Sequence, residues 1–164
     1  MDLDSAVHEL APRLLGYCFF RTGDRSLAED LAQESLTALV QRWRQHGAPE
    51  SPAAFVFAIA RRRAARAILR RRLWLPLNLA SANASTSADP ESDLVFKTER
   101  QRVLVALSGL AAKDRDVLLL VTVGELPLNE AAAALGITTS AVKMRALRAR
   151  RRLRELLENS NGRK

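Results

Sequence analysis

A run of small and polar residues divides this 164-residue chain. Residues 78–92 read Asn-Leu-Ala-Ser-Ala-Asn-Ala-Ser-Thr-Ser-Ala-Asp-Pro-Glu-Ser, a composition with too little apolar surface to offset the entropy lost on ordering. A chain interrupted in this way is not expected to form one continuous set of core elements. We therefore predict two small domains, residues 1–77 and 94–164, joined by a flexible linker over residues 78–93.

Both flanking zones have the hydrophobic periodicity of α-helices. The chain contains only seven glycines, and it lacks the alternating β-branched stretches that indicate strands. The periodicity predicts helices over residues 3–22, 26–45, 51–73, 94–107, 113–121, 128–135 and 139–157. In the third of these, Ser51 is the expected N-cap and Pro52 the first helical residue. The predicted fold class is all-α, with two small helical domains.

The charge of the chain predicts a polyanionic partner. Lysine and arginine number 26 against 18 aspartates and glutamates, a net charge of +8. A basic balance of this size favours nucleic acid or an anionic membrane surface. The membrane is the weaker option, because no apolar run approaches the roughly 20 residues of a membrane-spanning helix. We expect no membrane insertion and a cytoplasmic location.

Metal and nucleophile chemistry have little support in the sequence. Cys18 is the only cysteine, and His8 and His46 are the only histidines. This set forms neither a disulfide framework nor a zinc-binding motif, and it is too sparse for a histidine-dependent catalytic triad. We expect no catalytic residues, no metal and no cofactor, and we predict that the chain is not an enzyme.

Residues 126–152 have the pattern of a helix-turn-helix. A short alanine-rich helix is followed by Gly136, which can adopt the left-handed backbone that such a corner needs. Ile137 is expected to fill the corner, and Thr138 or Thr139 to cap the next helix. In that helix a buried stripe of apolar residues is predicted at helical spacing: Val142, Ala146, Ala149 and Leu153.

The second of these helices is strongly basic. Seven basic residues and no acidic one lie between Lys143 and Arg154. Basic residues near its N-terminus can pair with guanine acceptors in the major groove, whereas later arginines are suited to phosphate. The alternative is a basic helix that only faces solvent. We favour DNA binding because the glycine corner and the capped start accompany the charge.

A second cluster of arginines lies in the N-terminal zone. Seven arginines stand between residues 61 and 72, and no acidic residue lies between Ser51 and Pro76. Two basic segments separated by a linker would allow the chain to contact two separate DNA elements. His46, Ser51, Phe55 and Trp43 could add stacking or hydrogen bonds to single-stranded DNA. A solvated basic face and an RNA-binding arm are the alternatives.

The helix predicted over residues 26–45 carries an acidic and polar strip. Its members recur at helical spacing and share one side of the helix: Asp30, Gln33, Glu34, Thr37 and Gln41. Such a strip on a basic protein favours contact with a basic protein surface. The alternative is the ordinary solvent side of an amphipathic helix.

Taken together, these segments resemble the bacterial extracytoplasmic-function (ECF) sigma factors, RNA polymerase subunits with two regions joined by a linker. Residues 21–43, Arg-Thr-Gly-Asp-Arg-Ser-Leu-Ala-Glu-Asp-Leu-Ala-Gln-Glu-Ser-Leu-Thr-Ala-Leu-Val-Gln-Arg-Trp, are similar to the family's region 2. Residues 51–72 are similar to its −10-binding helix, and residues 110–157 to its region 4 helix-turn-helix. Ala141-Val142-Lys143-Met144-Arg145 departs from the Thr-Val-Lys-Ser-Arg common in the family.

The resemblance implies a transcription-initiation factor that binds core RNA polymerase and recognises −10 and −35 promoter elements. It implies docking on the polymerase β′ coiled coil through Asp30, Gln33 and Glu34. It further implies contact with −10 DNA by His46, Ser51, Arg61, Arg62 and Arg66. The −35 contacts would come from Thr139, Ser140, Lys143, Arg145 and Arg148. An anti-sigma factor is the further partner that the resemblance implies.

Two other functions compete with this interpretation. A stand-alone regulator could use the same helix-turn-helix as a dimer on a palindromic site. That function leaves the acidic strip and the arginines of residues 61–72 unexplained. A metal-dependent nuclease could use Asp30 and Glu34, but two carboxylates are expected on any charged amphipathic helix.

Overall fold

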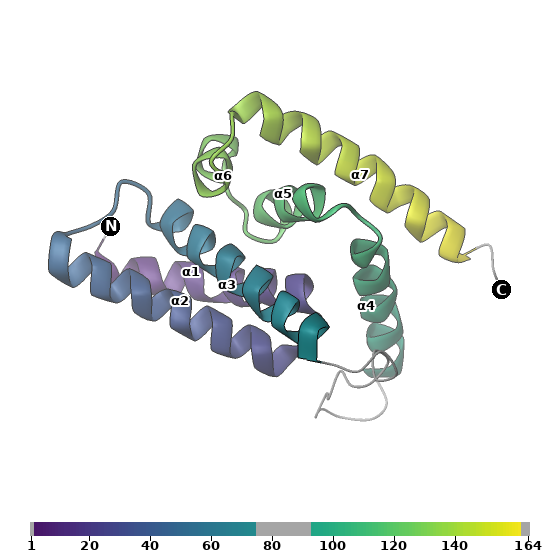
Figure 1. The fold of residues 1–164 in the computed structure, drawn as a ribbon, viewed down its shortest axis with the longest axis horizontal. Helices are drawn as coiled ribbons and strands as arrows, with labels where there is room; N and C mark the ends of the chain where they lie inside the picture. Colours follow the sequence, from purple (N-terminus) through teal and green to yellow (C-terminus); the bar gives the residue numbers. More distant parts are fainter. Residues whose placement is uncertain (1, 75–92, 162–164) are drawn as a thin grey trace.

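The computed structural model describes residues 2–74 and 93–161, and this part of the chain forms seven α-helices and no strand. They are α1 (Leu3–Thr22), α2 (Arg25–His46), α3 (Pro52–Trp74), α4 (Asp93–Ser108), α5 (Ala112–Thr122), α6 (Leu128–Leu135) and α7 (Thr139–Asn161) (Figure 1). The all-α prediction is confirmed, and each expected helix is present with ends that differ by a few residues at most. Nearly all of the predicted linker, residues 78–92, lies outside the described residues.

Local capping explains where the first helices begin and end. The Asp2 carboxylate accepts a 2.8 Å hydrogen bond from the Ser5 amide at the start of α1. Gly23 ends α1 with a left-handed φ of 70°, and Asp24 then caps α2 through the Leu27 amide at 2.9 Å. The Ser51 hydroxyl accepts from the Ala54 amide at 3.0 Å, so the predicted cap of α3 is confirmed.

Helices α1, α2 and α3 form one bundle, which we call the N-terminal bundle. Leu14, Tyr17, Leu39 and Phe57 are fully buried in it, and the rings of Tyr17 and Phe57 meet edge to face at 5.6 Å. Cys18 lies in the same core, where burial raises the pKa of its thiol to about 12. Cys18 is therefore a packing residue with almost no reactive thiolate at neutral pH.

Helices α4 to α7 form a second unit, which we call the C-terminal bundle. Its centre is the apolar face of α5, where Val117 and Leu120 are fully buried. The predicted stripe of α7 packs on it: Val142, Ala146 and Ala149 are buried, and Leu153 is partly buried. The helix-turn-helix is therefore held by apolar packing of α7 on α5.

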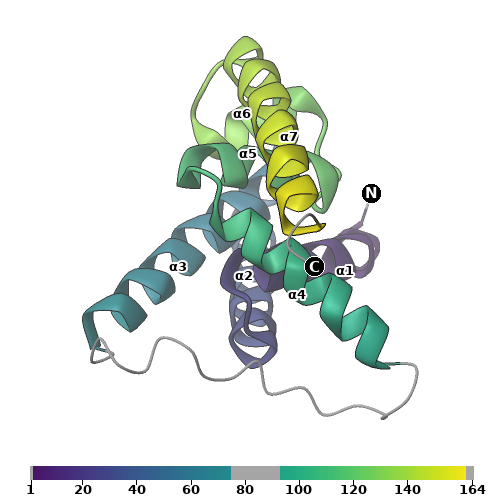
Figure 2. The same ribbon diagram turned by 90° about the vertical axis from the view of Figure 1, so that its right-hand side faces the viewer.

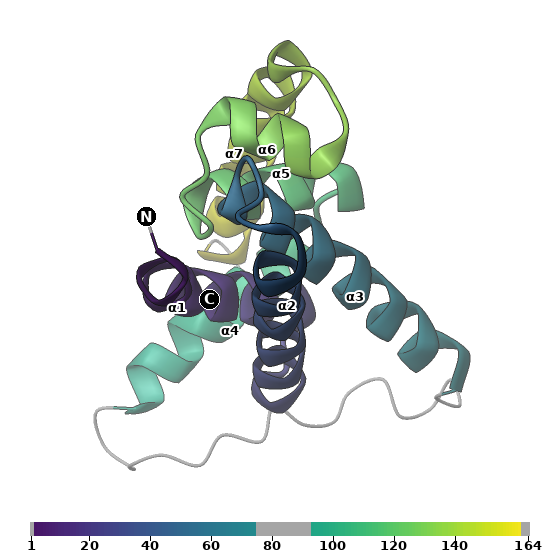
Figure 3. The same ribbon diagram turned by 90° about the vertical axis from the view of Figure 1, so that its left-hand side faces the viewer.

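The two bundles are packed against each other, which the sequence analysis did not predict. Their buried apolar residues belong to one continuous cluster, with α1 against α5 and α3 against α6. Figures 2 and 3 show the α5–α7 group seated above α1 and α3. The approach is close, since a Cβ added at Gly16 of α1 would lie 3.0 Å from the Val123 side chain.

Polar contacts also cross the boundary between the bundles. The Arg21 side chain donates to the Asp116 carboxylate at 2.6 Å, and both residues are buried. Arg13 donates to the carbonyl of Gly124 at 2.9 and 2.6 Å and to that of Glu125 at 3.1 Å. Glu125 has a left-handed φ of 50°, a strained backbone for a residue with a side chain. Arg13 thus supports a strained turn of the other bundle.

Among the described residues, none of the helices combines the length and the apolar character needed to span a bilayer.

Candidate nucleic-acid and protein interfaces

The acidic strip of α2 is an open surface. Asp30, Gln33 and Glu34 are all exposed, as are Thr37 and Gln41 farther along the same side. Beside the strip runs a groove of about 540 Å³ between α1 and α2, whose apolar lining includes Leu15, Leu36 and Val40. An exposed polar strip bordering an apolar groove is suited to binding a partner helix.

Two carboxylates, one within the strip and one at the N-cap of α2, hold arginines of α3. Glu34 forms an ion pair with Arg63, and Asp24 accepts a 2.5 Å hydrogen bond from Arg71. Both pairs are partly exposed, so each contributes little to stability. Their main effect is to orient two of the seven arginines, Arg63 and Arg71, toward α2.

The five residues predicted to contact −10 DNA fall into two places. His46 is exposed at the end of α2, and Ser51 uses its hydroxyl to cap α3. Arg62 and Arg66 are exposed in the middle of α3, and Arg61 beside them is partly buried with its Nε atom enclosed. At 1.5 Å per residue, about 15–20 Å of helix separates the two places. They form an extended surface along α3 rather than one patch.

The helix-turn-helix corner has the predicted geometry. Gly136 adopts a φ of 65°, and the Ile137 amide donates to the Ala132 carbonyl at 3.1 Å. The cap of α7 is Thr138, whose hydroxyl accepts from the Ala141 amide at 3.2 Å. Of the two threonines left open by the sequence, the first is the cap. Thr139 and Ser140 are exposed in the first turn of α7.

The basic residues of α7 differ in how they are held. Lys143 is exposed, and Arg145 is partly buried. Arg148 is exposed, yet it donates to both carboxylate oxygens of Asp114, at 2.8 and 2.7 Å. Its hydrogen bonds lower the pKa of the Asp114 carboxyl, so the pair is charged at neutral pH. A bidentate pair of this kind fixes the direction of the Arg148 guanidinium.

Sequence reasoning missed Asp114 and Asp116. Both lie in Lys113-Asp-Arg-Asp at the start of α5, where acidic residues are ordinary because they complement the helix dipole. Their partners, Arg148 and Arg21, are 34 and 95 residues away, so no local pattern could have signalled the pairs.

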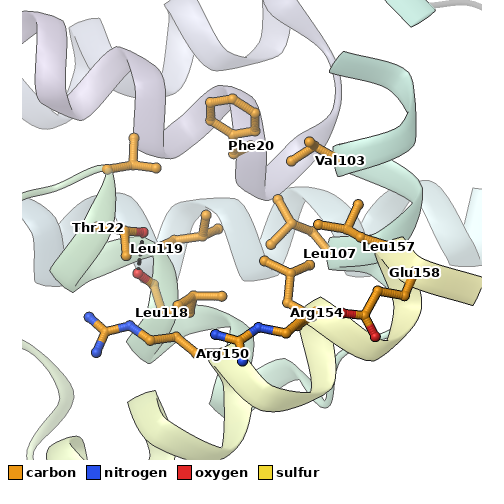
Figure 4. Close-up of a pocket in the computed structure, with 12 residues that line it drawn as sticks. Phe20, Val103, Leu107, Leu118, Leu119, Thr122, Arg150, Arg154, Leu157 and Glu158 are labelled. Atoms are coloured by element: carbon orange, nitrogen blue, oxygen red, sulfur yellow. Dashed lines mark hydrogen bonds between the residues drawn. The ribbon is translucent and has the colours of Figure 1, made fainter. Parts of the chain in front are cut away.

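An apolar pocket of about 570 Å³ opens where the two bundles meet. Phe20 of α1 forms one wall, and Leu107, Leu119 and Leu157 come from α4, α5 and α7 (Figure 4). Charged side chains line it as well: Arg150, Arg154 and Glu158. Because both bundles contribute lining residues, the pocket exists only while they are packed together.

Comparison with known proteins gives a consistent result. The family model "Sigma-70 region 2" matches residues 6–73, and "Sigma-70, region 4" matches residues 100–153. The ECF RNA polymerase sigma factor SigD of Mycobacterium tuberculosis is 35% identical, over 93% of this chain and 76% of the relative. The ECF RNA polymerase sigma factor ShbA of Streptomyces griseus is 33% identical, over 96% of this chain and 86% of the relative.

Two solved structures share the fold over nearly the whole chain. The sigma factor RpoE of Bartonella quintana, in complex with the anti-sigma factor NepR, matches with a TM-score of 0.70 at 24% identity, covering 94% of this chain and 96% of that one. CnrH, in complex with the cytosolic domain of CnrY, also has a TM-score of 0.70, at 21% identity, covering 96% and 88% of the two chains. With both sigma regions matched in order and relatives of this identity, the chain belongs to the ECF RNA polymerase sigma factors, which direct polymerase to promoters.

Proposed function

We propose that this sigma factor docks on core RNA polymerase through α2 and contacts promoter DNA through α3 and the start of α7. The observation that carries the proposal is the division of α7 into two faces. Its Val142–Ala146–Ala149 stripe is buried, while Thr139, Ser140 and Lys143 are exposed at a capped N-terminus. A helix held in this way can enter a major groove with its first two turns.

The polymerase contact is proposed for the exposed strip of α2. Gln33 lines the apolar groove that contains Leu36 and Val40, so a helix of the β′ coiled coil can bury apolar side chains there. Asp30 is exposed on the same helix. Glu34 adds a second carboxylate to the same face, although it also holds Arg63. Basic residues on the partner would complete the contact.

The DNA contacts are proposed for two separate basic surfaces. The −10 element would be followed from the end of α2 along α3 by His46, Ser51, Arg61, Arg62 and Arg66. Thr139, Ser140, Lys143 and Arg145 would face the −35 element, with Arg148 directed by Asp114. Phosphate contacts by arginine make such binding strongly dependent on salt.

An anti-sigma factor is proposed as the inhibitory partner. Both solved structures of the same fold hold a partner: RpoE is bound to the anti-sigma factor NepR, and CnrH is bound to the cytosolic domain of CnrY. The pocket between the bundles, with Arg150 and Arg154 beside an apolar floor, suits an amphipathic helix with acidic residues. We place the chain's action in the cytoplasm, where it contributes binding and no catalysis of its own.

The docking proposal is tested by reversing one charge on α2. Asp30→Lys should reduce association with core polymerase by at least tenfold, because it places a cation where the partner is expected to be basic. Asp4→Lys makes the same change on an exposed residue of α1 and serves as the matched control. Association is measured by competition with a labelled wild-type chain for core polymerase.

Both variants should bind a −35 duplex as the wild type does, since the change lies on the other bundle. Equal competition by Asp30→Lys and Asp4→Lys would contradict the docking role of α2.

A further inference from the structure

Four buried hydrogen-bond donors have no acceptor within the part of the chain that the structure describes. They are the Tyr17 hydroxyl, Nη1 of Arg21, Nε of Arg61 and Nε of Arg115. Tyr17 is fully buried and Arg21 is 7% exposed, whereas Arg61 and Arg115 are partly buried. Buried polar groups in folded proteins nearly always have a partner, so a group of unmet donors indicates a partner that the chain itself does not supply.

The donors lie together where α1 packs against α3 and α5. Tyr17 and Arg21 are one helical turn apart on α1. The Tyr17 ring meets that of Phe57 at 5.6 Å, and Phe57 lies one turn before Arg61 on α3. Burial raises the pKa of the Tyr17 hydroxyl well above its ordinary value, and the nearby Asp116 carboxylate raises it further. The charges of Arg21 and Arg61 act on the same pKa in the opposite direction.

Arg115 reaches the same junction from α5. It directly precedes Asp116, whose carboxylate accepts from Nε of Arg21 at 2.6 Å. Burial lowers the pKa of the Arg115 guanidinium, and the positive charge of Arg21 lowers it further. Asp114, the other carboxylate at the start of α5, is held by Arg148. The junction therefore holds three guanidinium groups that stay charged at neutral pH, and Asp116 can offset one of them.

The chemistry of the unmet groups identifies the partner. All four are donors, so the partner that fits them is an acceptor, and the excess positive charge favours an anion. A carboxylate is planar and suits a single guanidinium, whereas the oxygens of phosphate point in several directions and can accept from three helices. We propose that this junction binds a phosphate group, with Tyr17 and Arg21 on its inner side and Arg61 and Arg115 on its outer side.

Burial limits what can carry the phosphate group. The Tyr17 hydroxyl and Nη1 of Arg21 are enclosed, so a continuous DNA backbone cannot reach them. The long side chains of Arg61 and Arg115 are partly exposed, and they can move aside to admit a small anion and then close on it. The site accepts free phosphate or the terminal phosphate of a nucleotide. It shares Arg61 with the proposed −10 surface, but it requires neither DNA nor polymerase.

Calorimetric titration of the full chain with inorganic phosphate tests the proposal, with sodium chloride at equal ionic strength as the baseline. The wild type should bind a single phosphate. Arg115→Gln should bind at least tenfold more weakly, because it removes a charged hydrogen bond to the anion. Arg151→Gln removes an exposed arginine of α7 and is the matched control. Its affinity should stay within about twofold of the wild type, since the change is distant from the site.

Tyr17→Phe distinguishes a phosphate site from misfolding. The Tyr17 hydroxyl has no acceptor in the described chain, so its removal should leave the thermal unfolding midpoint without phosphate unchanged or raise it. The same change should weaken phosphate binding by about tenfold, because the hydroxyl donates to a phosphate oxygen. Phosphate should accordingly raise the midpoint of the wild type more than that of Tyr17→Phe. Absence of saturable binding by the wild type would overturn the proposal, and so would equal affinities of the wild type and either site variant.

Titrations with ADP and adenosine identify the source of the phosphate group. Tighter binding of ADP than of inorganic phosphate, lost in Arg115→Gln, supports a site for the terminal phosphate of a nucleotide. The reverse order supports a site for the free anion. Equal binding of ADP and adenosine would overturn the proposal, because the phosphate would then contribute nothing. These measurements use neither promoter nor polymerase, so a negative result leaves the proposed function untouched.

Discussion

At the scale of single residues, the basic side chains of this protein differ in whether they are held by an acidic side chain of the same chain. Arg21 is buried against Asp116, Arg63 is paired with Glu34, and Arg148 is fixed by two hydrogen bonds to Asp114. Lys143 belongs to the same basic run but is exposed near the start of α7. A count of positive charge therefore overstates the number of residues whose first partner would be DNA.

The Asp114–Arg148 pair gives a prediction for −35 binding. Asp114→Asn should weaken binding to a −35 duplex severalfold, because Arg148 loses a bidentate charged partner and samples more rotamers. In a chain that already carries Arg148→Ala, the same change should have no further effect. Fluorescence anisotropy titrations of the four proteins measure this coupling. Additive effects of the two substitutions would contradict a positioning role for Asp114.

The same pair predicts a dependence of stability on pH. The hydrogen bonds from Arg148 lower the pKa of the Asp114 carboxyl in the folded state. A lowered pKa means that the pair's contribution is fully present above about pH 5 and is lost as the pH falls through the folded pKa. Between pH 5 and pH 2 the wild type should therefore lose more stability than Asp114→Asn. Urea unfolding at several pH values measures the difference, and parallel profiles would contradict it.

At the scale of elements, the helices were predictable because their ends are encoded locally. The bounds of α1 and α6 agree with the sequence prediction, and Ser51 caps α3 as expected. Apolar spacing also identified the buried stripe of α7. For the cap of α7 the sequence left two candidates, Thr138 and Thr139. They are adjacent and have the same hydroxyl group, so only the structure identifies Thr138 as the cap.

The corner of the helix-turn-helix predicts the effect of a small substitution. Gly136→Ala should destabilise the protein by about 1 kcal/mol, because Gly136 has a φ of 65° and alanine is strained there. The added Cβ meets no atom within 4 Å beyond the adjacent residues, so backbone strain and not a clash is the expected cause. Gly23→Ala, at a φ of 70° after α1, is the matched control. Only Gly136→Ala should also weaken −35 duplex binding, as measured by anisotropy.

At the scale of the whole molecule, the sequence predicted two domains and a linker, but it did not predict that they would pack together. The surfaces that meet are carried by α1, α3, α5 and α6, each of which also packs within its own bundle. An ion pair such as Arg21–Asp116 joins residues 95 positions apart and leaves no periodic pattern. Local sequence patterns were enough to identify the candidate binding residues. The residues that hold the bundles together could be identified only from the tertiary structure.

The boundary between the bundles gives a prediction for molecular size. Asp116→Asn leaves the buried Arg21 charge without its counterion, an arrangement that typically costs about 3–5 kcal/mol. Separation of the bundles hydrates Arg21 and relieves that penalty. The radius of gyration, about 15 Å for a compact chain of this length, should therefore increase in the variant. Small-angle X-ray scattering measures it.

Glu99→Gln is the control for this measurement, because it neutralises an exposed carboxylate of α4 that pairs with Arg102 of the same helix. An unchanged radius for Asp116→Asn, with the fold retained by circular dichroism, would show that the pair does not hold the bundles together.

The strained turn at Glu125 links the two ends of the molecule. Its carbonyl and that of Gly124 accept hydrogen bonds from Arg13, and the turn leads directly into α6, the first helix of the helix-turn-helix. Loss of these donors would leave the two carbonyls to water and lower the local stability of the turn. Arg13 of α1 therefore supports the backbone from which the helix-turn-helix begins, although it lies more than 100 residues away in the sequence.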